Sequence, residues 1–149
     1  MDKTSEAKGA PAESLEGRHV LLCEDHPLNQ EIAKAILEGK QARVTIADNG
    51  EAGVKMFLGS SIGYFDCIMM DIHMPVMDGY EATRSIRALN RSDAKTVPII
   101  AMTADAFADD VQRCLDAGMN GHIAKPFEPQ KLYLLLKDFI LRDEEGAEK

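Results

Sequence analysis

This chain has fewer basic than acidic residues, with 17 lysines and arginines against 25 acidic residues and a net charge of −8. No basic stripe is available to neutralise nucleic-acid phosphates, so we expect no binding of DNA or RNA by this domain. Apolar runs are short, and none approaches the roughly 20 residues that cross a bilayer. Since no signal peptide precedes the first apolar segment, we expect a cytoplasmic domain without direct membrane contact, in a parent protein that is free to carry a membrane anchor.

Cysteine and histidine patterns that bind metals are also missing. Cys23, Cys67 and Cys114 show no CxxC spacing, and the four histidines show no metal-ligand spacing. We expect the three cysteines to be small buried hydrophobic residues in a reducing environment.

The chain does contain five short apolar segments that alternate with amphipathic stretches. The pattern predicts strands at about 19–23, 42–47, 65–70, 97–102 and 121–124, and helices at about 27–38, 50–58, 79–90, 107–117 and 129–141. Because parallel strands need crossover connections, five such units predict an α/β fold in which helices cover both faces of a five-stranded parallel sheet.

The length of 149 residues suits one domain, which we assign to residues 18–141. Residues 1–17 have no periodic apolar face and are predicted to be a flexible linker or a tag remnant. Residues 142–149 are predicted to be an acidic C-terminal tail.

Two local patterns predict details of the helices. One face of the first helix carries apolar residues that we expect to point to the core: Leu28, Ile32, Ala35 and Ile36. An acid followed three residues later by glutamate resembles a helix capping box, and it occurs at 48–51 and again at 78–81.

Five polar side chains follow four of the predicted strands. Glu24 and Asp25 follow the first strand, Asp71 the third, Thr103 the fourth and Lys125 the fifth. Ligands of open parallel sheets bind beyond the carboxyl ends of the strands, where the strand order reverses. We therefore expect these five side chains to share one small cleft that solvent can reach.

Such a cleft suits a divalent cation and a phosphoryl group. Several carboxylates repel one another unless a cation neutralises them, and carboxylate oxygens are ligands that Mg²⁺ accepts, with Mn²⁺ as a substitute. Asp71, on the most apolar strand, is then the natural nucleophile toward phosphorus and would form an acyl phosphate. Lys125 and the Thr103 hydroxyl would contact the phosphoryl oxygens.

The motifs around these residues resemble the receiver domains of two-component response regulators, the CheY-like family, and most of all the receivers attached to hybrid sensor histidine kinases. The resemblance lies in four segments, 21–25 with Asn29, 69–79, 98–104 and 118–126. It implies a flavodoxin-like, doubly wound sheet with strand order 2-1-3-4-5. It also implies that Asp71 accepts a phosphoryl group from a phosphohistidine of a histidine kinase or a histidine phosphotransfer domain.

The resemblance further implies the ligands of the cation. Asp25, Asp71 and the backbone carbonyl of His73 would hold Mg²⁺ directly, and Glu24 would act through water. Lys125 would bridge to the phosphoryl group, and the Lys125–Pro126 peptide bond would be cis.

Four residues are expected to switch or tune the domain. Thr103 would swing toward the phosphoryl group and move the neighbouring loop. His122 occupies the position where the family often has a tyrosine or phenylalanine that couples to the threonine. His73 and Asp105 would flank the attacking water and set the lifetime of the acyl phosphate.

Two other functions compete with a phosphoacceptor switch. A phosphatase of the haloacid dehalogenase type also forms an aspartyl phosphate, but such enzymes place a second aspartate where this chain has His73, and no cap domain is present. An interaction module that has lost phosphorylation is the third possibility. We expect a signalling domain that is not an enzyme and whose own chemistry is limited to weak self-phosphorylation and autodephosphorylation. We expect its parent protein to be a hybrid histidine kinase. We also expect a monomer that can dimerise on phosphorylation.

Overall fold

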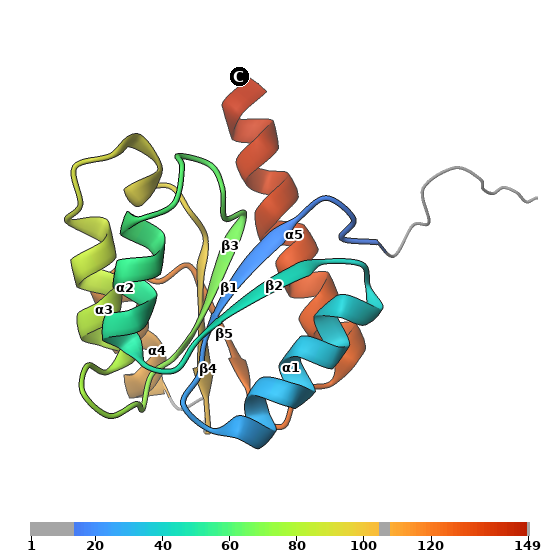
Figure 1. Cartoon of the computed structure of the whole chain (residues 1–149), viewed down its shortest axis with the longest axis horizontal. Helices are drawn as coiled ribbons and strands as arrows, with labels where there is room; N and C mark the ends of the chain where they lie inside the picture. Colours follow the sequence, from blue (N-terminus) through green and yellow to red (C-terminus); the bar gives the residue numbers. More distant parts are fainter. Residues whose placement is uncertain (1–13, 105–107, 149) are drawn as a thin grey trace, which may run out of the picture.

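The computed structural model describes residues 14–104 and 108–148, with side chains described for 14–104 and 111–141. Strands and helices alternate along the chain in this order: β1 (His19–Cys23), α1 (Pro27–Gly39), β2 (Arg43–Ala47), α2 (Gly50–Leu58), β3 (Cys67–Asp71), α3 (Gly79–Arg87), the short 3-10 helix η1 (Ser92–Ala94), β4 (Ile99–Thr103), α4 (Ala108–Ala117), β5 (Gly121–Ala124) and α5 (Pro129–Glu148). The five strands form one sheet in the order β2-β1-β3-β4-β5, and every pairing is parallel (Figure 1). The predicted fold class and strand order are confirmed.

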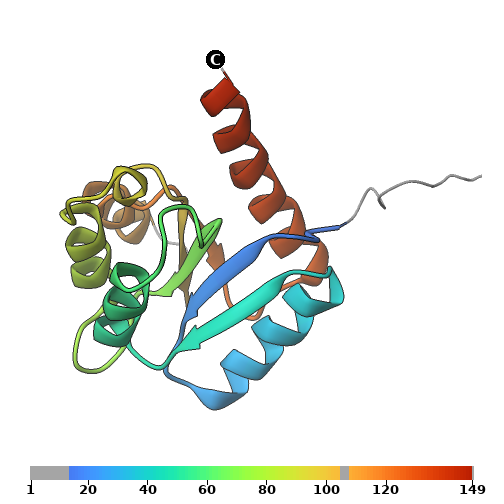
Figure 2. The ribbon, with the colours of Figure 1, turned by 45° about the horizontal axis from the view of Figure 1, so that its top comes forward.

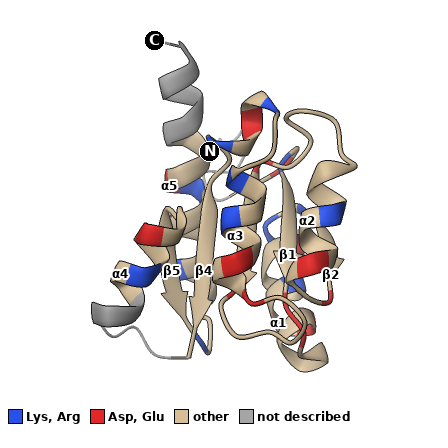
Figure 3. Cartoon of the chain, turned by 90° about the vertical axis from the view of Figure 1, so that its left-hand side faces the viewer, with Lys and Arg blue, Asp and Glu red and all other residues tan. Residues whose placement is uncertain are grey.

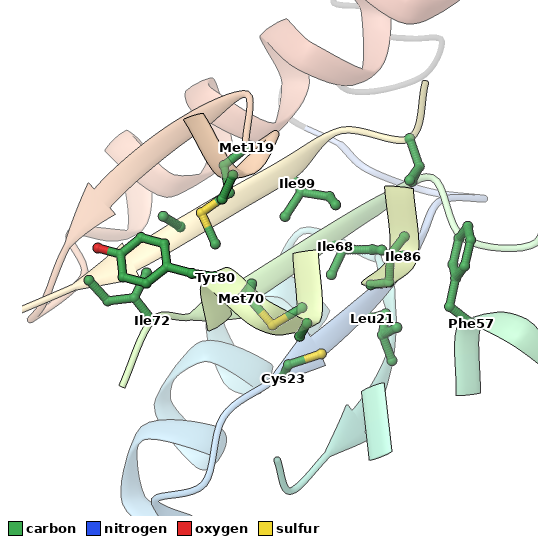
Figure 4. Close-up of a cluster of buried hydrophobic side chains, with 14 of the residues drawn as sticks. Leu21, Cys23, Phe57, Ile68, Met70, Ile72, Tyr80, Ile86, Ile99 and Met119 are labelled. Carbon is green, nitrogen blue, oxygen red and sulfur yellow. The ribbon is translucent and has the colours of Figure 1, made fainter. Parts of the chain in front are cut away.

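Helices cover both faces of this sheet. α1 and α5 lie on one face, and α2, α3 and α4 lie on the other (Figures 1 and 2). Every residue of β1, β3 and β4 is buried, because these three strands occupy the middle of the sheet. The core on the α2–α4 side combines residues such as Leu21, Ile68 and Ile99 from the strands with Phe57 and Ile86 from the helices (Figure 4).

The strand register brings the polar strand ends together. Cys23 pairs with Met70, so Glu24 follows β1 beside the position of Asp71 at the end of β3. Asp71 in turn pairs with Met102, one residue before Thr103. Because all strands run the same way, their carboxyl ends share one edge, and acidic residues lie in the loops at that edge (Figure 3).

The buried face of α1 differs from the predicted one. Ala33 and Leu37 are buried, whereas Leu28 is 61 % exposed and Ile32 is 39 % exposed. The helix carries two overlapping apolar stripes, and local periodicity alone does not choose between them. Packing against the sheet selects the stripe that contains the small Ala33. Of the predicted face, Ile36 is half-buried and packs against the core, whereas Leu28 and Ile32 stay on the surface.

Only one of the two predicted capping boxes forms. At α3 the Glu81 N–H donates to Asp78 Oδ1 and the Asp78 N–H donates to the Glu81 carboxylate, as predicted. At α2 the cap is Asn49, whose Oδ1 accepts from the Ala52 N–H. An asparagine in this position caps as well as an aspartate does, and Asp48 is left for another partner.

The ordered body extends beyond the predicted domain at both ends. Leu15, assigned to the linker by sequence, is 3 % exposed, and its N–H donates to the Lys40 carbonyl. Residues 1–13 of the predicted linker lie outside the described residues. Helix α5 continues seven residues past its predicted end and through most of the predicted tail, because arginine, glutamate and alanine favour helix. Among the described residues, no helix combines the length and apolar character that crossing a membrane requires.

Candidate functional site

Glu24 lies at the centre of the polar edge, directly after β1. Its side chain is almost completely buried, at 1 % exposed. The Glu24 N–H donates to the Ala47 carbonyl at 3.0 Å, and its Oε2 accepts from the His26 N–H at 3.0 Å. These bonds hold the carboxylate at the start of α1, where the partial positive charge of the helix amino terminus favours an anion.

Asp71 is the last residue of β3, and contacts to its side chain and to the backbone after it fix its position. It is 4 % exposed, and its Oδ1 accepts from the His73 N–H at 3.1 Å. The following loop returns to the strand end, since the Gly79 N–H donates to the Ile72 carbonyl at 3.1 Å. A Cβ atom at Gly79 would collide with the Asp71 carbonyl oxygen and lie 2.8 Å from the Ile72 Cα, so this close return requires glycine.

Lys125 forms ion pairs with both buried carboxylates. Its Nζ lies 2.9 Å from Asp71 Oδ2 and 2.9 Å from Glu24 Oε1. Burial of the ammonium by itself lowers the pKa of Lys125, but the two carboxylates outweigh it and the pKa is raised above its ordinary value. Lys125 is therefore a cation at neutral pH. The Lys125–Pro126 peptide bond is cis, as the resemblance implies.

Thr103 ends β4 at the same edge. It is 2 % exposed, and its hydroxyl has no hydrogen-bond partner among the described residues. A buried hydroxyl without a partner is costly. The Thr103 carbonyl oxygen accepts a hydrogen bond from the Lys125 N–H at 2.7 Å, so Thr103 lies beside Lys125 at this edge.

Three carboxylates at this edge fit a divalent cation. Oxygen atoms of Glu24, Asp25 and Asp71 all lie within 4.8 Å of one another. Asp25 is exposed, so the site reaches solvent on this side. Hard oxygen donors at this spacing, with room for water, are the ligand set of Mg²⁺. The structure thus brings together all five residues that the sequence assigned to the site.

The predicted tuning residues have different surroundings. His73 is exposed, and its peptide N–H borders Asp71 as described above. His122 lies in β5 and lines an apolar cavity of about 320 Å³ between α4 and α5, together with Leu115 and Phe139. Asp105 lies outside the described residues.

Gln30 is a polar residue of the site that sequence reasoning missed. It lies in α1, and its Nε2 donates to the Glu24 carbonyl at 2.6 Å and to Asp48 Oδ1 at 3.0 Å. No motif marks this glutamine. The signal that remains is its position on the first turns of the helix that follows the acidic pair.

Comparison with known proteins identifies relatives of this chain. The family described as the response regulator receiver domain matches residues 20–137. A similar solved structure is the receiver domain of a sensor histidine kinase from Pseudomonas aeruginosa, with a magnesium ion coordinated in its active site cleft. It has 42 % sequence identity and a TM-score of 0.75, and the match covers 83 % of this chain and 98 % of that one.

Among curated proteins the relatives are much longer than this chain. Hybrid signal transduction histidine kinase I of Dictyostelium discoideum is 36 % identical over 126 residues, which is 83 % of this chain and 7 % of the kinase. A peroxide stress-activated histidine kinase of Schizosaccharomyces pombe is 34 % identical over 131 residues, 87 % of this chain and 6 % of the kinase. The chain therefore spans less than a tenth of each of these two relatives.

Proposed function

This chain belongs to the family of response regulator receiver domains of two-component signalling, and from that membership we propose that Asp71 accepts a phosphoryl group from a phosphohistidine of a partner protein. An oxygen of the Asp71 carboxylate forms a bond to phosphorus while the phosphorus–nitrogen bond breaks. The imidazole nitrogen leaves with the electron pair and takes a proton from water. The product is an acyl phosphate on Asp71.

The observation that carries this proposal is the contact of Lys125 with two buried carboxylates. The ammonium lies 2.9 Å from Asp71 Oδ2 and from Glu24 Oε1, so it neutralises the nucleophile before the reaction. Its flexible side chain can follow the negative charge to a phosphoryl oxygen once the acyl phosphate forms. The buried hydroxyl of Thr103 donates to another phosphoryl oxygen and thereby gains the partner that it lacks among the described residues.

The acidic edge of the sheet would hold Mg²⁺, or Mn²⁺ in its place. Asp25, Asp71 and the His73 carbonyl are the proposed direct ligands, and Glu24 acts through water because Lys125 and the His26 N–H already occupy its oxygens. When bound, the cation supplies positive charge that offsets the phosphoryl oxygens.

Thr103 is the proposed switch. Movement of its side chain toward the phosphoryl group would pull the segment that follows β4. His122 lines the cavity between α4 and α5, so we propose that it reports this movement at that surface. His73 and Asp105 are proposed to tune the lifetime of the acyl phosphate.

The exposed apolar stripe of α1 is the proposed contact for the partner. Leu28 and Ile32 are exposed on the helix whose first turn follows Asp25. A histidine kinase or a histidine phosphotransfer domain that covers these side chains would bury apolar surface and bring its phosphohistidine to Asp71. The names of the curated relatives support a hybrid histidine kinase as the parent protein.

Further proposals concern the behaviour of the domain. We propose a signalling domain whose own chemistry is limited to weak self-phosphorylation and autodephosphorylation. The net charge of −8 supports a domain that does not bind nucleic acid. The buried thiols of Cys23 and Cys67 support a cytoplasmic location. We further propose that the domain is a monomer that dimerises on phosphorylation. The domain itself makes no membrane contact in this proposal, and any membrane anchor belongs to the parent protein.

The comparisons give no support to the phosphatase alternative, because the relatives are receiver domains and histidine kinases. The structure adds that the position two residues after Asp71, where such a phosphatase needs an acid, holds the exposed His73.

The proposal is tested by incubating the protein with acetyl phosphate and Mg²⁺ and measuring its mass. We expect an adduct of about 80 Da, one phosphoryl group, that maps to Asp71. Asp71→Asn should abolish the adduct, whereas the matched control Asp116→Asn on the exposed side of α4 should retain it. An adduct that persists in folded Asp71→Asn would overturn the assignment.

A further inference from the structure

Gln30 joins the ends of two neighbouring strands. Its side-chain Nε2 donates one hydrogen bond to the Glu24 carbonyl at 2.6 Å and another to Asp48 Oδ1 at 3.0 Å. A primary amide has two N–H donors, and both partners are acceptors without a proton to give. This fixes the orientation of the amide, with its nitrogen toward the two strand ends and its oxygen away from them.

The bond to the Glu24 carbonyl matters because that carbonyl belongs to the peptide that leads into Asp25. The same residue is already held at its N–H by Ala47 and at its Oε2 by the His26 N–H. With Gln30 on the carbonyl, the Glu24–Asp25 peptide cannot rotate without breaking a bond. The plane of this peptide sets the direction in which the exposed Asp25 side chain leaves the chain.

The neutral amide is suited to this task. A lysine or arginine in its place would add a second cation next to the acids and compete with a bound metal ion. A glutamate would repel Asp48 and the carbonyl oxygen. Glutamine supplies two donors and no charge, so it orders the strand ends while leaving the negative charge of the site available.

We propose that Gln30 is a positioning residue for the divalent cation, which acts by fixing the peptide that aims the Asp25 carboxylate. The proposal rests on the proposed function, since it names a further residue on which the cation site depends. Residues that orient metal ligands from behind typically change metal affinity by about 10-fold or more when they are replaced.

The test is a titration of the full chain with MgCl₂, followed by the NMR amide resonances of Asp25 and His73. Gln30→Met keeps the length of the side chain and removes both donors. The matched control is Gln112→Met on α4, where the glutamine amide also donates to a carboxylate, Asp116, at 2.9 Å but on an exposed surface. We expect the dissociation constant for Mg²⁺ to rise about 10-fold in Gln30→Met and to stay unchanged in Gln112→Met.

The outcomes separate this inference from the proposed function. If wild-type protein binds Mg²⁺ and folded Gln30→Met binds it within twofold of the same constant, the role of Gln30 is refuted and the phosphoacceptor proposal stands. If wild-type protein shows no Mg²⁺-dependent shift, both are refuted. The same spectra report folding, and should Gln30→Met not fold, Gln30→Leu removes the donors without adding charge and is judged by the same twofold limit.

Discussion

Replacing Lys125 by methionine should leave two buried carboxylates facing each other without a cation. Methionine keeps most of the aliphatic side chain, so the change removes the charge more than the packing. Glu24 and Asp71 are 1 % and 4 % exposed, and water cannot take over the role of the ammonium without opening the site.

The expected cost follows from the geometry. Oxygens of the two carboxylates lie within 4.8 Å, and two unit charges at such a distance repel by about 3.5 kcal/mol at an effective dielectric constant near 20. Small movements of the side chains relieve part of this repulsion. We therefore expect the free energy of unfolding to fall by about 2–3 kcal/mol, a large share of the total stability of a domain of this size.

Urea denaturation at pH 7.5, without and with MgCl₂, measures this cost. The matched control is Lys131→Met, because Lys131 pairs with Glu128 at a similar distance of 2.8 Å but with side chains that are 74 % and 66 % exposed. Exposed pairs contribute little, so we expect no measurable change in the control. Since a bound cation stabilises the native state, MgCl₂ should restore more stability to Lys125→Met than to wild-type protein.

Two results would contradict this reasoning. One is a decrease in the free energy of unfolding of Lys125→Met that is no larger than the decrease in Lys131→Met. This result would mean that the buried acids do not depend on the ammonium. The other is a decrease in the free energy of unfolding that MgCl₂ leaves unchanged. This result would mean that the carboxylates left without Lys125 do not attract a divalent cation.

Two further predictions concern the backbone of the site and the opposite end of β1. Gly79→Ala should lower the free energy of unfolding by about 1–3 kcal/mol and slow phosphorylation by acetyl phosphate, because the new Cβ displaces the Asp71 backbone. The control is Gly39→Ala, whose new Cβ meets open space. In the same urea and mass assays it should be neutral or stabilising. Burial and the nearby Arg43 lower the pKa of His19 below 6.5. Folding therefore favours the neutral ring, and the resulting stability is present above pH 6.5 and is lost as the pH falls through the lowered pKa. Urea denaturation at pH 7.5 and 5.5 should show a smaller acid-induced loss in His19→Gln than in wild-type protein, and an equal loss would contradict the assignment.

Local sequence was enough to predict the order of the elements and the location of the site. Apolar segments of strand length followed by amphipathic stretches require crossover connections, so a parallel sheet follows from the pattern. Residues placed directly after strands, such as Glu24, Asp71 and Thr103, must then lie at one edge. This conclusion does not depend on how any side chain packs.

Side-chain packing could not be predicted from the sequence. Leu28 and Ile32 on α1 look like core residues by periodicity, and only contact with the sheet shows that Ala33 and Leu37 occupy the core instead. Asp48 has the pattern of a helix cap, yet Asn49 caps α2.

The same limit applies to the contacts that make the site chemically competent. Lys125 meets Asp71 across 54 positions of the chain, and Gln30 meets Asp48 across 18. The sequence determined which groups arrive at the edge of the sheet, because hydrophobic periodicity and strand direction are local properties. Which of those groups touch follows from the fold in three dimensions, because hydrogen bonds and ion pairs between distant residues depend on how strands and helices pack.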